Sequence, residues 1–158
     1  MGNAQVKGNG NLASEMRKLS NFKAIEITIG YDKIIVNCGE EPSLHISGDE
    51  NILPLITTRI SKGILKIESD STFETKADSE IIINVKSLKE FTFDGVGETV
   101  IQNVNSDKFI CTINGVGSCD LNGKVKSFNI SVNGVGSVNA RQLISDDVVA
   151  NLNGVGSV

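Results

Sequence analysis

One phrase occurs four times in the C-terminal half of the chain: Asp94-Gly-Val-Gly97, Asn114-Gly-Val-Gly117, Asn133-Gly-Val-Gly136 and Asn153-Gly-Val-Gly156. The first glycines of successive copies lie 20, 19 and 20 residues apart. An internal period of this length indicates stacked structural repeats, each of which contacts its neighbours. The phrase therefore decides the fold that we predict for this half of the chain.

Apolar and polar residues alternate on both sides of each phrase. In the first copy, Phe91 and Phe93 precede the phrase, Thr99 and Ile101 follow it, and Val104 stands further on. A period of two indicates strands that bury one face. Three short strands in about 20 residues leave no room for a crossover helix, so each strand should pair in parallel with its equivalent one repeat later. We therefore predict an all-β protein with a β-helix, a three-sided solenoid of about 20 residues per coil.

The glycines and the residue before them are predicted to build the corners of this coil. Glycine permits a sharp corner and a close approach of the next coil's backbone. The expected turn glycines are Gly95, Gly97, Gly115, Gly117, Gly134, Gly136, Gly154 and Gly156. The expected ladder, whose side chains would form hydrogen bonds along the stack, consists of Asp94, Asn114, Asn133 and Asn153.

Two ligand-binding interpretations of the same phrase fit the sequence less well than a role in the corners of the coil. A nucleotide-binding loop needs a third glycine and a following helix, and the sequence has neither pattern. Residues 115–121 approach a calcium-binding nonapeptide repeat, but the period is not nine and Asp120 does not recur in the other copies. We expect no cofactor and no bound metal.

Composition narrows the classes of function further. The 158 residues carry a formal net charge of -4, 22% of them are charged, and only 4% are aromatic. An acidic chain without clusters of lysine and arginine is a poor candidate for binding nucleic acid. No apolar run approaches the roughly 18 residues of a membrane-spanning helix, so we predict no such segment.

Residue types that carry catalysis are scarce. His45 is the only histidine and falls on the outward side of an alternating strand, so we expect no histidine-activated nucleophile. Three cysteines cannot all pair within one chain. Cys111 and Cys119 fall in inward columns, which leaves Cys38, beside Gly39, as the better candidate for a free thiol.

One class of enzyme remains as an alternative. Pectate-lyase-like β-helix enzymes combine calcium-binding acids with an arginine base, and Arg141, Asp146 and Asp147 offer these residue types. Neighbouring carboxylates on a strand point to opposite faces, however, so an adjacent pair would not act together. We predict no catalytic residue.

The chain is predicted to form one structural unit of three stretches. Residues 1–22 should be an extended lead-in, residues 23–86 an N-terminal region of irregular, partly antiparallel strands, and residues 87–158 the regular repeats. The repeats should be continuous with the region before them.

Local patterns in the middle stretch predict paired strands. Residues 24–29 and 34–36 should form a hairpin, and residues 57–60 and 63–68 should form a second strand pair. Residues 51–56 should include a short helical turn, which their proline keeps from extending.

Several segments carry a family resemblance. They are Gly8-Asn-Gly-Asn11, Phe22-Lys-Ala-Ile-Glu-Ile27, Pro42-Ser-Leu-His-Ile-Ser-Gly-Asp-Glu-Asn-Ile52, Gly63-Ile-Leu-Lys-Ile67 and the recurring Asn-Gly-Val-Gly-Ser. In this order they resemble the bacterial head GIN domain family, which is labelled as auto-transporter adhesins. The resemblance covers roughly Gly8 to Val158, although this chain has Gly-Val-Gly where the family often has Gly-Ser-Gly.

The resemblance implies a right-handed parallel β-helix and no established catalytic residues. It also implies export to the periplasm, outer membrane or cell surface of a Gram-negative bacterium, usually behind a signal peptide or lipoprotein leader. The start of this chain, Met1-Gly-Asn-Ala-Gln5, has neither a charged nor an apolar leader region, so we expect no signal peptide in it.

These observations favour a non-catalytic module of the cell envelope or surface, an adhesin that binds a glycan or a protein. The alternatives are a polysaccharide-active, pectate-lyase-like enzyme and a structural spacer. The last coil should expose an apolar end and an unpaired strand edge, which predicts self-association there.

Overall fold

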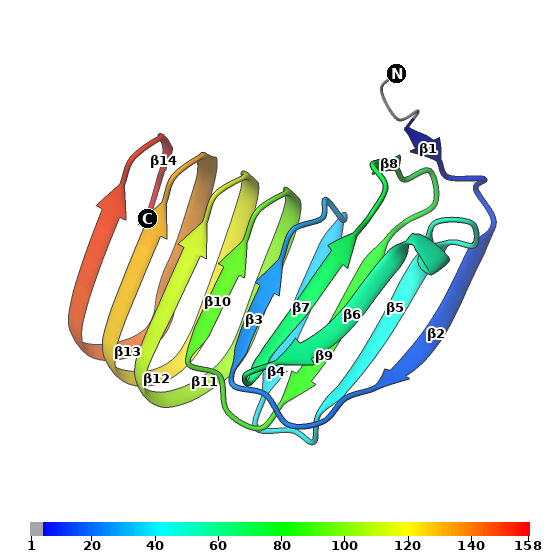
Figure 1. Ribbon diagram of the computed structural model, residues 1–158. Helices are drawn as coiled ribbons and strands as arrows, with labels where there is room; N and C mark the ends of the chain where they lie inside the picture. Colours follow the sequence, from blue (N-terminus) through cyan, green and yellow to red (C-terminus); the bar gives the residue numbers. More distant parts are fainter. Residues whose placement is uncertain (1–4) are drawn as a thin grey trace.

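The computed structural model describes residues 5–158, and within them one large β-sheet curls back on itself as a half-barrel (Figure 1). The elements, in chain order, are β1 (Val6–Lys7), β2 (Leu12–Lys18), β3 (Ala24–Ile27), β4 (Lys33–Cys38), β5 (Ser43–Asp49), the 3-10 helix η1 (Leu53–Leu55), β6 (Ile56–Ser61), β7 (Ile64–Ser69), β8 (Phe73–Glu74), β9 (Glu80–Val85), β10 (Glu90–Phe93), β11 (Val96–Ile113), β12 (Val116–Val132), β13 (Val135–Leu152) and β14 (Val155–Ser157). The protein is all-β.

The strand order defines a mixed sheet. In the described part of the chain, twelve strands form it, and nine of them follow the order β2-β5-β9-β4-β11-β10-β3-β7-β6. The pairs at both ends of this path are antiparallel. The pairs between them are parallel. From β11 the sheet also continues through β12 and β13 to β14, again by parallel pairing.

The predicted three-sided solenoid, a right-handed parallel β-helix, is wrong. The finding that overturns it is the curled mixed sheet, in which the antiparallel strand pairs and the repeats form one continuous sheet. Each repeat is also one continuous bent strand instead of three short ones, with 18 residues in β11, 17 in β12 and 18 in β13. The physical reason is that the period near 20 covers only the C-terminal half. The shorter strands of the N-terminal half join the same sheet but do not follow that period.

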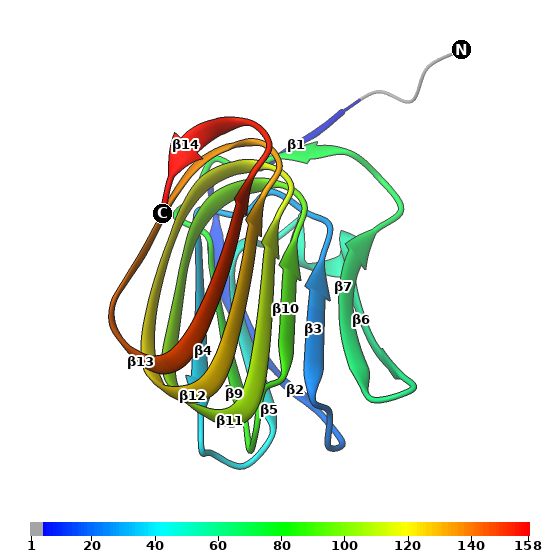
Figure 2. The same ribbon diagram turned by 90° about the vertical axis from the view of Figure 1, so that its left-hand side faces the viewer.

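Equivalent positions of successive repeats nevertheless pair in parallel. Val116 pairs with Val96 on one side and with Val135 on the other. The same register stacks the inward rings of Phe109 and Phe128, whose centroids lie 6.0 Å apart with 9° between their planes. Both rings are buried in the apolar core. Figure 2 shows how the strands curl.

The register between β11 and β12 is interrupted once along the strands. The register shifts after Ile101, so that Val104 pairs with Gly123 and not with Val125. Asn103 has a φ of 62° and Gly123 a φ of 137°, both in the region that favours glycine. The shift absorbs the one-residue difference in length between these repeats.

The hairpin predicted from residues 24–29 and 34–36 is also wrong. β3 pairs with β7 and β10, whereas β4 pairs with β9 and β11, so the two strands lie in different parts of the curl. The segment between them buries Ile29 and Tyr31, and the amide of Tyr31 donates to the carbonyl of Val96 at 3.0 Å. It is therefore a corner packed on the core, which a solvent-exposed hairpin loop would not be.

Other local predictions are confirmed. Residues 57–60 and 63–68 belong to β6 and β7, which pair antiparallel. The helical turn expected in residues 51–56 is η1. In β5, Leu44 and Ile46 are buried and His45 between them is only half-buried, which agrees with its predicted outward side.

The stretch predicted as an extended lead-in contains two strands in its described part. β2 pairs antiparallel with β5 at one end of the sheet, and β1 pairs with β8 in a small separate sheet. Residues 1–4 lie outside the described residues.

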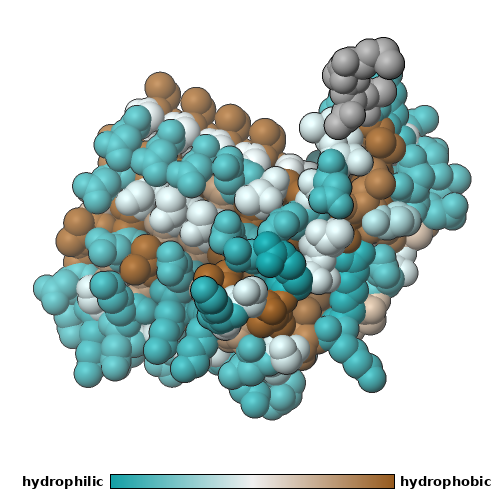
Figure 3. Space-filling view, viewed as in Figure 1, coloured by the Kyte–Doolittle hydropathy of each residue, from teal (hydrophilic) through white to brown (hydrophobic). Residues whose placement is uncertain are grey.

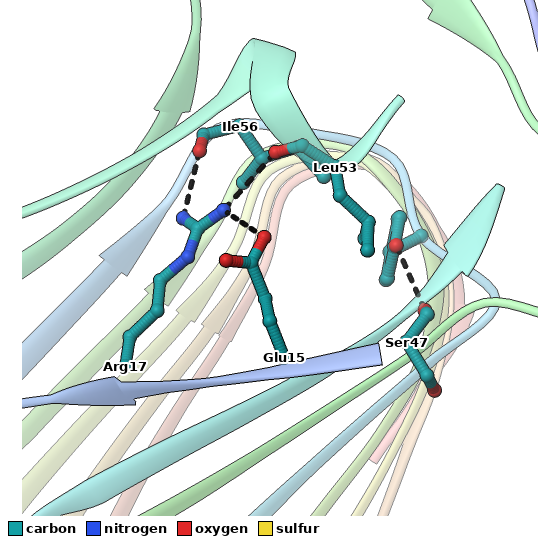
Figure 4. A network of polar contacts seen from close by, with 6 residues as sticks. Glu15, Arg17, Ser47, Leu53 and Ile56 are labelled. Atoms are coloured by element: carbon teal, nitrogen blue, oxygen red, sulfur yellow. Dashed lines mark hydrogen bonds and ion pairs between the residues drawn. The ribbon is translucent and has the colours of Figure 1, made fainter. Parts of the chain in front are cut away.

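A side chain links the two ends of the nine-strand path (Figure 4). Arg17 on β2 donates from Nη1 to the carbonyl oxygen of Ile56 at 2.7 Å, and from Nη2 to that of Leu53 at 3.0 Å. The same Nη2 donates to the carboxylate of Glu15 at 3.0 Å. Because Ile56 begins β6, Arg17 connects the two edges of the curl without a backbone ladder.

The buried carboxylate of Asp49 fixes the polar segments next to β5. It accepts backbone N–H groups from Gly10, Lys76 and Ala77 at 2.8, 2.9 and 3.0 Å. Burial by itself would raise the pKa of Asp49, but these N–H groups outweigh it and hold the pKa below its usual value. One ionised side chain thus ties together three segments that are distant in sequence.

Candidate functional site

An open groove of about 1160 Å³ lies where β11, β12 and β13 bend midway along their length. In Figure 2 these bends stack behind one another at the lower end of the curl. The groove is lined by Ser87, Lys89, Glu90, Asn105, Ser106, Asp107, Lys108, Ile110, Lys124, Val125, Lys126, Ile144 and Asp146.

Strand alternation explains why charged side chains line this groove. Val125 points inward and is buried, so Lys124 and Lys126 on either side of it point outward. The parallel register then places Asn105, Lys124 and Ile144 in one row across three adjacent strands. The row is a product of pairing between repeats and is not a cluster in the sequence.

The groove gathers most of the basic residues of the C-terminal half, together with three carboxylates. Four of the five basic residues beyond residue 87 line it, in a chain whose formal net charge is -4. Lys126 lies 3.7 Å from the carboxylate of Asp107. In the described part of the chain, no carboxylate lies within ion-pair distance of Lys89, Lys108 or Lys124. Three exposed ammonium groups therefore lack a protein partner.

The turn glycines predicted from the sequence lie at the other bend of the repeats, away from the groove. A Cβ atom on Gly115 would overlap the backbone of Gly95, and one on Gly134 would overlap Gly115. The second glycine of each phrase stacks in the same way, as Gly136 does on Gly117. Gly97, Gly154 and Gly156 likewise abut backbone: the carbonyl of Tyr31, Gly134 and Gly136 respectively. This close backbone approach leaves no side-chain surface for a ligand.

The predicted ladder lies beside these glycines. Asn153 Nδ2 donates to Asn133 Oδ1 at 2.9 Å, and Asn133 Nδ2 donates to Asn114 Oδ1 at 2.7 Å. At the first position, the amide of Asp94 donates to the carbonyl of Ile27 at 2.8 Å. The three amide side chains thus form a hydrogen-bonded row along the stack.

An exposed apolar row next to the ladder was missed by the sequence analysis. The valine between the two glycines of each phrase is 48% to 71% exposed: Val96, Val116, Val135 and Val155. Figure 3 shows apolar atoms along the ridge above the repeats. The alternation of the strands indicates this outward position, because each valine is an odd number of residues from the buried columns.

No arrangement for catalysis is assembled from the residues considered for it. Asp146 lines the groove and Asp147 pairs with Ser127 in the neighbouring strand, but Arg141 does not line the groove. Within residues 5–158, no three or more His, Cys, Asp or Glu residues are grouped as metal ligands would be. His45 has no part in the groove.

The three cysteines are buried and unpaired. Burial raises the pKa of the Cys38 thiol to about 12. A hydrogen bond with Cys119, together with burial, raises the pKa of Cys111 well above its ordinary value. Nucleophilic cysteines need a lowered pKa, so Cys38 and Cys111 resemble small apolar core residues.

A family match covers most of the chain. Residues 21–158 match the family described as "Putative auto-transporter adhesin, head GIN domain". The chain belongs to the head GIN domain family. The comparison with curated proteins found no match. Within the described residues, no helix of this family member has the length and apolar character needed to cross a membrane.

Several solved structures share the fold of this chain. A "putative adhesin" from Parabacteroides distasonis is 18% identical, with a TM-score of 0.58 over 97% of this chain and 83% of that one. A "putative adhesin" from Parabacteroides merdae is also 18% identical, with a TM-score of 0.62 over 96% and 82% of the two chains. A "putative lipid binding protein" from Parabacteroides distasonis is 15% identical, with a TM-score of 0.65 over 98% and 100%. At these identities the likeness concerns the fold alone.

Proposed function

We propose that this head GIN domain is a non-catalytic module of the bacterial cell envelope or surface that binds a glycan or a protein through the groove. The observation that carries the proposal is the groove itself, with its three unpartnered lysines and its exposed amide and hydroxyl groups. Apart from Ser87 and Lys89, which precede β10, these side chains stand on hydrogen-bonded strands, so the backbone beneath them is fixed before a ligand arrives. The family label of adhesin is consistent with this role.

The same family assignment supports the proposed location. An adhesin acts where it meets another surface, so we place the protein at the envelope or cell surface. The alternatives are an enzyme that cleaves polysaccharides and a spacer that binds nothing. The groove holds Glu90, Asp107 and Asp146, but none of these carboxylates is buried, as a general acid with a raised pKa usually is.

The test is binding of the purified protein to a broad glycan array, followed by incubation of any bound glycan to look for cleavage. Asn105→Trp would fill the groove with a bulky ring, and Ser137→Trp is the matched control on an exposed position outside the groove. We expect binding without cleavage, loss of binding in the first variant and retention in the second. Release of products would instead support the enzyme, and a protein that binds neither glycans nor envelope proteins would be a spacer.

Self-association is the second part of the proposal. Val148, Val149 and Leu152 at the end of β13 are 59%, 54% and 46% exposed, and Val155 on β14 is 71% exposed. Val148 and Leu152 continue inward columns that are buried in β12, where Phe128 and Val132 occupy them. Apolar side chains in this position favour a contact with a second copy of the domain.

A further inference from the structure

We propose that the groove binds an acidic glycan, a chain of sugars that carries carboxylate or sulfate groups. This inference rests on the proposed function and names the class of ligand for the same site. The groups that would recognise it are the ammonium groups of Lys89, Lys108 and Lys124.

The lysines of the groove are not equivalent. Lys126 has a partner in Asp107, and the next strand offers Asp146 at the adjacent outward position. Its ammonium group therefore already has a carboxylate of the protein beside it. Lys89, Lys108 and Lys124 have no such partner among the described residues, so they can pair with charges on a ligand.

The row across the strands gives the groove a direction. Asn105, Lys124 and Ile144 lie on adjacent parallel strands, which are spaced about 4.8 Å apart. One row thus presents an amide, a cation and an apolar side chain over roughly 10 Å. Hydroxyl groups, a charged group and the apolar face of a sugar ring require these three kinds of contact. Ile144 is 65% exposed, so it is available for the last of them.

The lining residues disfavour nucleic acid as the polyanion. Proteins that bind single strands stack bases on aromatic rings, and no aromatic residue lines this groove. Binding to a duplex requires many phosphate contacts, whereas three carboxylates, Glu90, Asp107 and Asp146, interrupt the lysines. Charges that are spaced along a polysaccharide fit this mixed surface better than a dense row of phosphates does.

The experiment measures binding of the whole protein to polygalacturonate, dextran sulfate, unsubstituted dextran and a DNA duplex at low and at moderate salt. The test variant is Lys89→Gln/Lys108→Gln/Lys124→Gln. The matched control is Lys7→Gln/Lys18→Gln/Lys62→Gln, which changes the net charge equally at exposed lysines outside the groove. Lys126→Gln tests the lysine that already has a partner. Circular dichroism and thermal unfolding check that each variant is folded.

We expect the wild-type protein to bind polygalacturonate or dextran sulfate and not dextran. The groove variant should lose at least tenfold in affinity, and the control should stay within about threefold of wild type. Lys126→Gln should lose less affinity than the groove variant does. Salt should weaken binding, because the contacts are between exposed charges. Preference for one of the two acidic polymers would distinguish carboxylate from sulfate recognition.

Four results would overturn the inference. Equal losses in the two triple variants would show that only net charge matters, and tighter binding to the DNA duplex would assign a different polyanion. A further result would be binding to neutral glycans on the array. If Asn105→Trp abolishes this binding and the lysine changes do not affect it, the proposed function stands and only the acidic ligand is ruled out. Absence of binding to every glycan and protein would remove both.

Discussion

The carboxylate of Asp49 and the hydroxyl of Thr99 are both fully buried, but they differ in their hydrogen bonds. Asp49 accepts three backbone N–H groups. Thr99 Oγ1 has no partner within residues 5–158. A buried polar group costs free energy unless it is paired, so these two side chains should affect stability in opposite directions.

We expect Asp49→Asn to lower the free energy of unfolding by about 2 kcal/mol at neutral pH, because an amide cannot accept all three N–H groups. The pKa of Asp49 is lowered in the folded state, so its contribution is present above the unfolded carboxyl pKa of about 3.9 and is lost as the pH falls toward the folded value. Urea unfolding at pH 7 and near pH 3 should therefore show a smaller difference between variant and wild type in acid. A constant difference at both pH values would contradict this assignment.

Thr99→Val should raise the free energy of unfolding by about 1 kcal/mol, since it replaces an unpaired hydroxyl by a methyl group of similar shape. Valine already occupies the equivalent inward position of another repeat, at Val138. Thermal unfolding of the two proteins is the measurement, and Thr57→Val on an exposed position is the control. A destabilised variant would mean that the Thr99 hydroxyl has a partner, such as a buried water molecule.

Among the elements, β2 depends on a side chain as well as on its ladder. Arg17→Met keeps the aliphatic stem but removes the donors to the carbonyl groups of Leu53 and Ile56. We expect a loss of about 1 to 3 kcal/mol, with faster hydrogen exchange in β2 and unchanged exchange in β12. Lys18→Met, an exposed neighbour without such bonds, should have little effect. Unchanged protection of β2 in Arg17→Met would contradict the role assigned to this arginine.

The stacking of the long strands depends on glycine. A Cβ atom on Gly134 would overlap the carbonyl oxygen of Gly115, so Gly134→Ala should force β12 and β13 apart at this bend. We expect destabilisation by more than 2 kcal/mol. Val135→Ala is the adjacent control, and it should change stability by less than 0.5 kcal/mol because Val135 is 52% exposed. Equal midpoints of chemical unfolding for the two variants would refute the steric argument.

The sequence predicts how a strand pairs when its partner carries the same repeated pattern, but not when its partner is a distant segment without that pattern. Alignment of the phrase predicts that Val96, Val116 and Val135 pair, because the period repeats the same local pattern. The shift that pairs Val104 with Gly123 depends on two residues with positive φ, which the apolar pattern does not reveal. β3 and β4 alternate as hairpin strands do, but their partners are distant in sequence, and local periodicity does not identify them.

At the scale of the whole molecule, the mixed sheet and the groove were both beyond the sequence analysis. Local alternation predicts the antiparallel pair of β6 and β7. The antiparallel pairs of β5 with β2 and β9 instead join segments that have no repeated motif. The groove gathers Lys89, Lys108 and Lys124 from three different strands or loops, so no cluster of lysines is visible along the chain. Composition therefore indicates an acidic protein, although one surface of it is locally cationic.

The exposed apolar end of the repeats predicts that the protein self-associates in solution. We expect the sedimentation coefficient to rise with concentration in the wild-type protein, because Val148 and Leu152 are inward-column residues that remain exposed. Val148→Lys should reduce this rise, whereas Val96→Lys, on the apolar row at a distant strand, should not. A monomer at every concentration would contradict self-association through this surface.

The residue-by-residue pairing of β11, β12 and β13 has an evolutionary consequence. Duplication of the DNA that encodes one repeat would insert another strand between two that already fit each other, leaving both antiparallel ends of the sheet untouched. Each such event would lengthen the groove by one strand spacing, about 4.8 Å, and add one more set of outward side chains. Descendants of one gene could therefore come to hold longer or shorter ligands through unequal recombination, without any change in the way the rest of the chain folds.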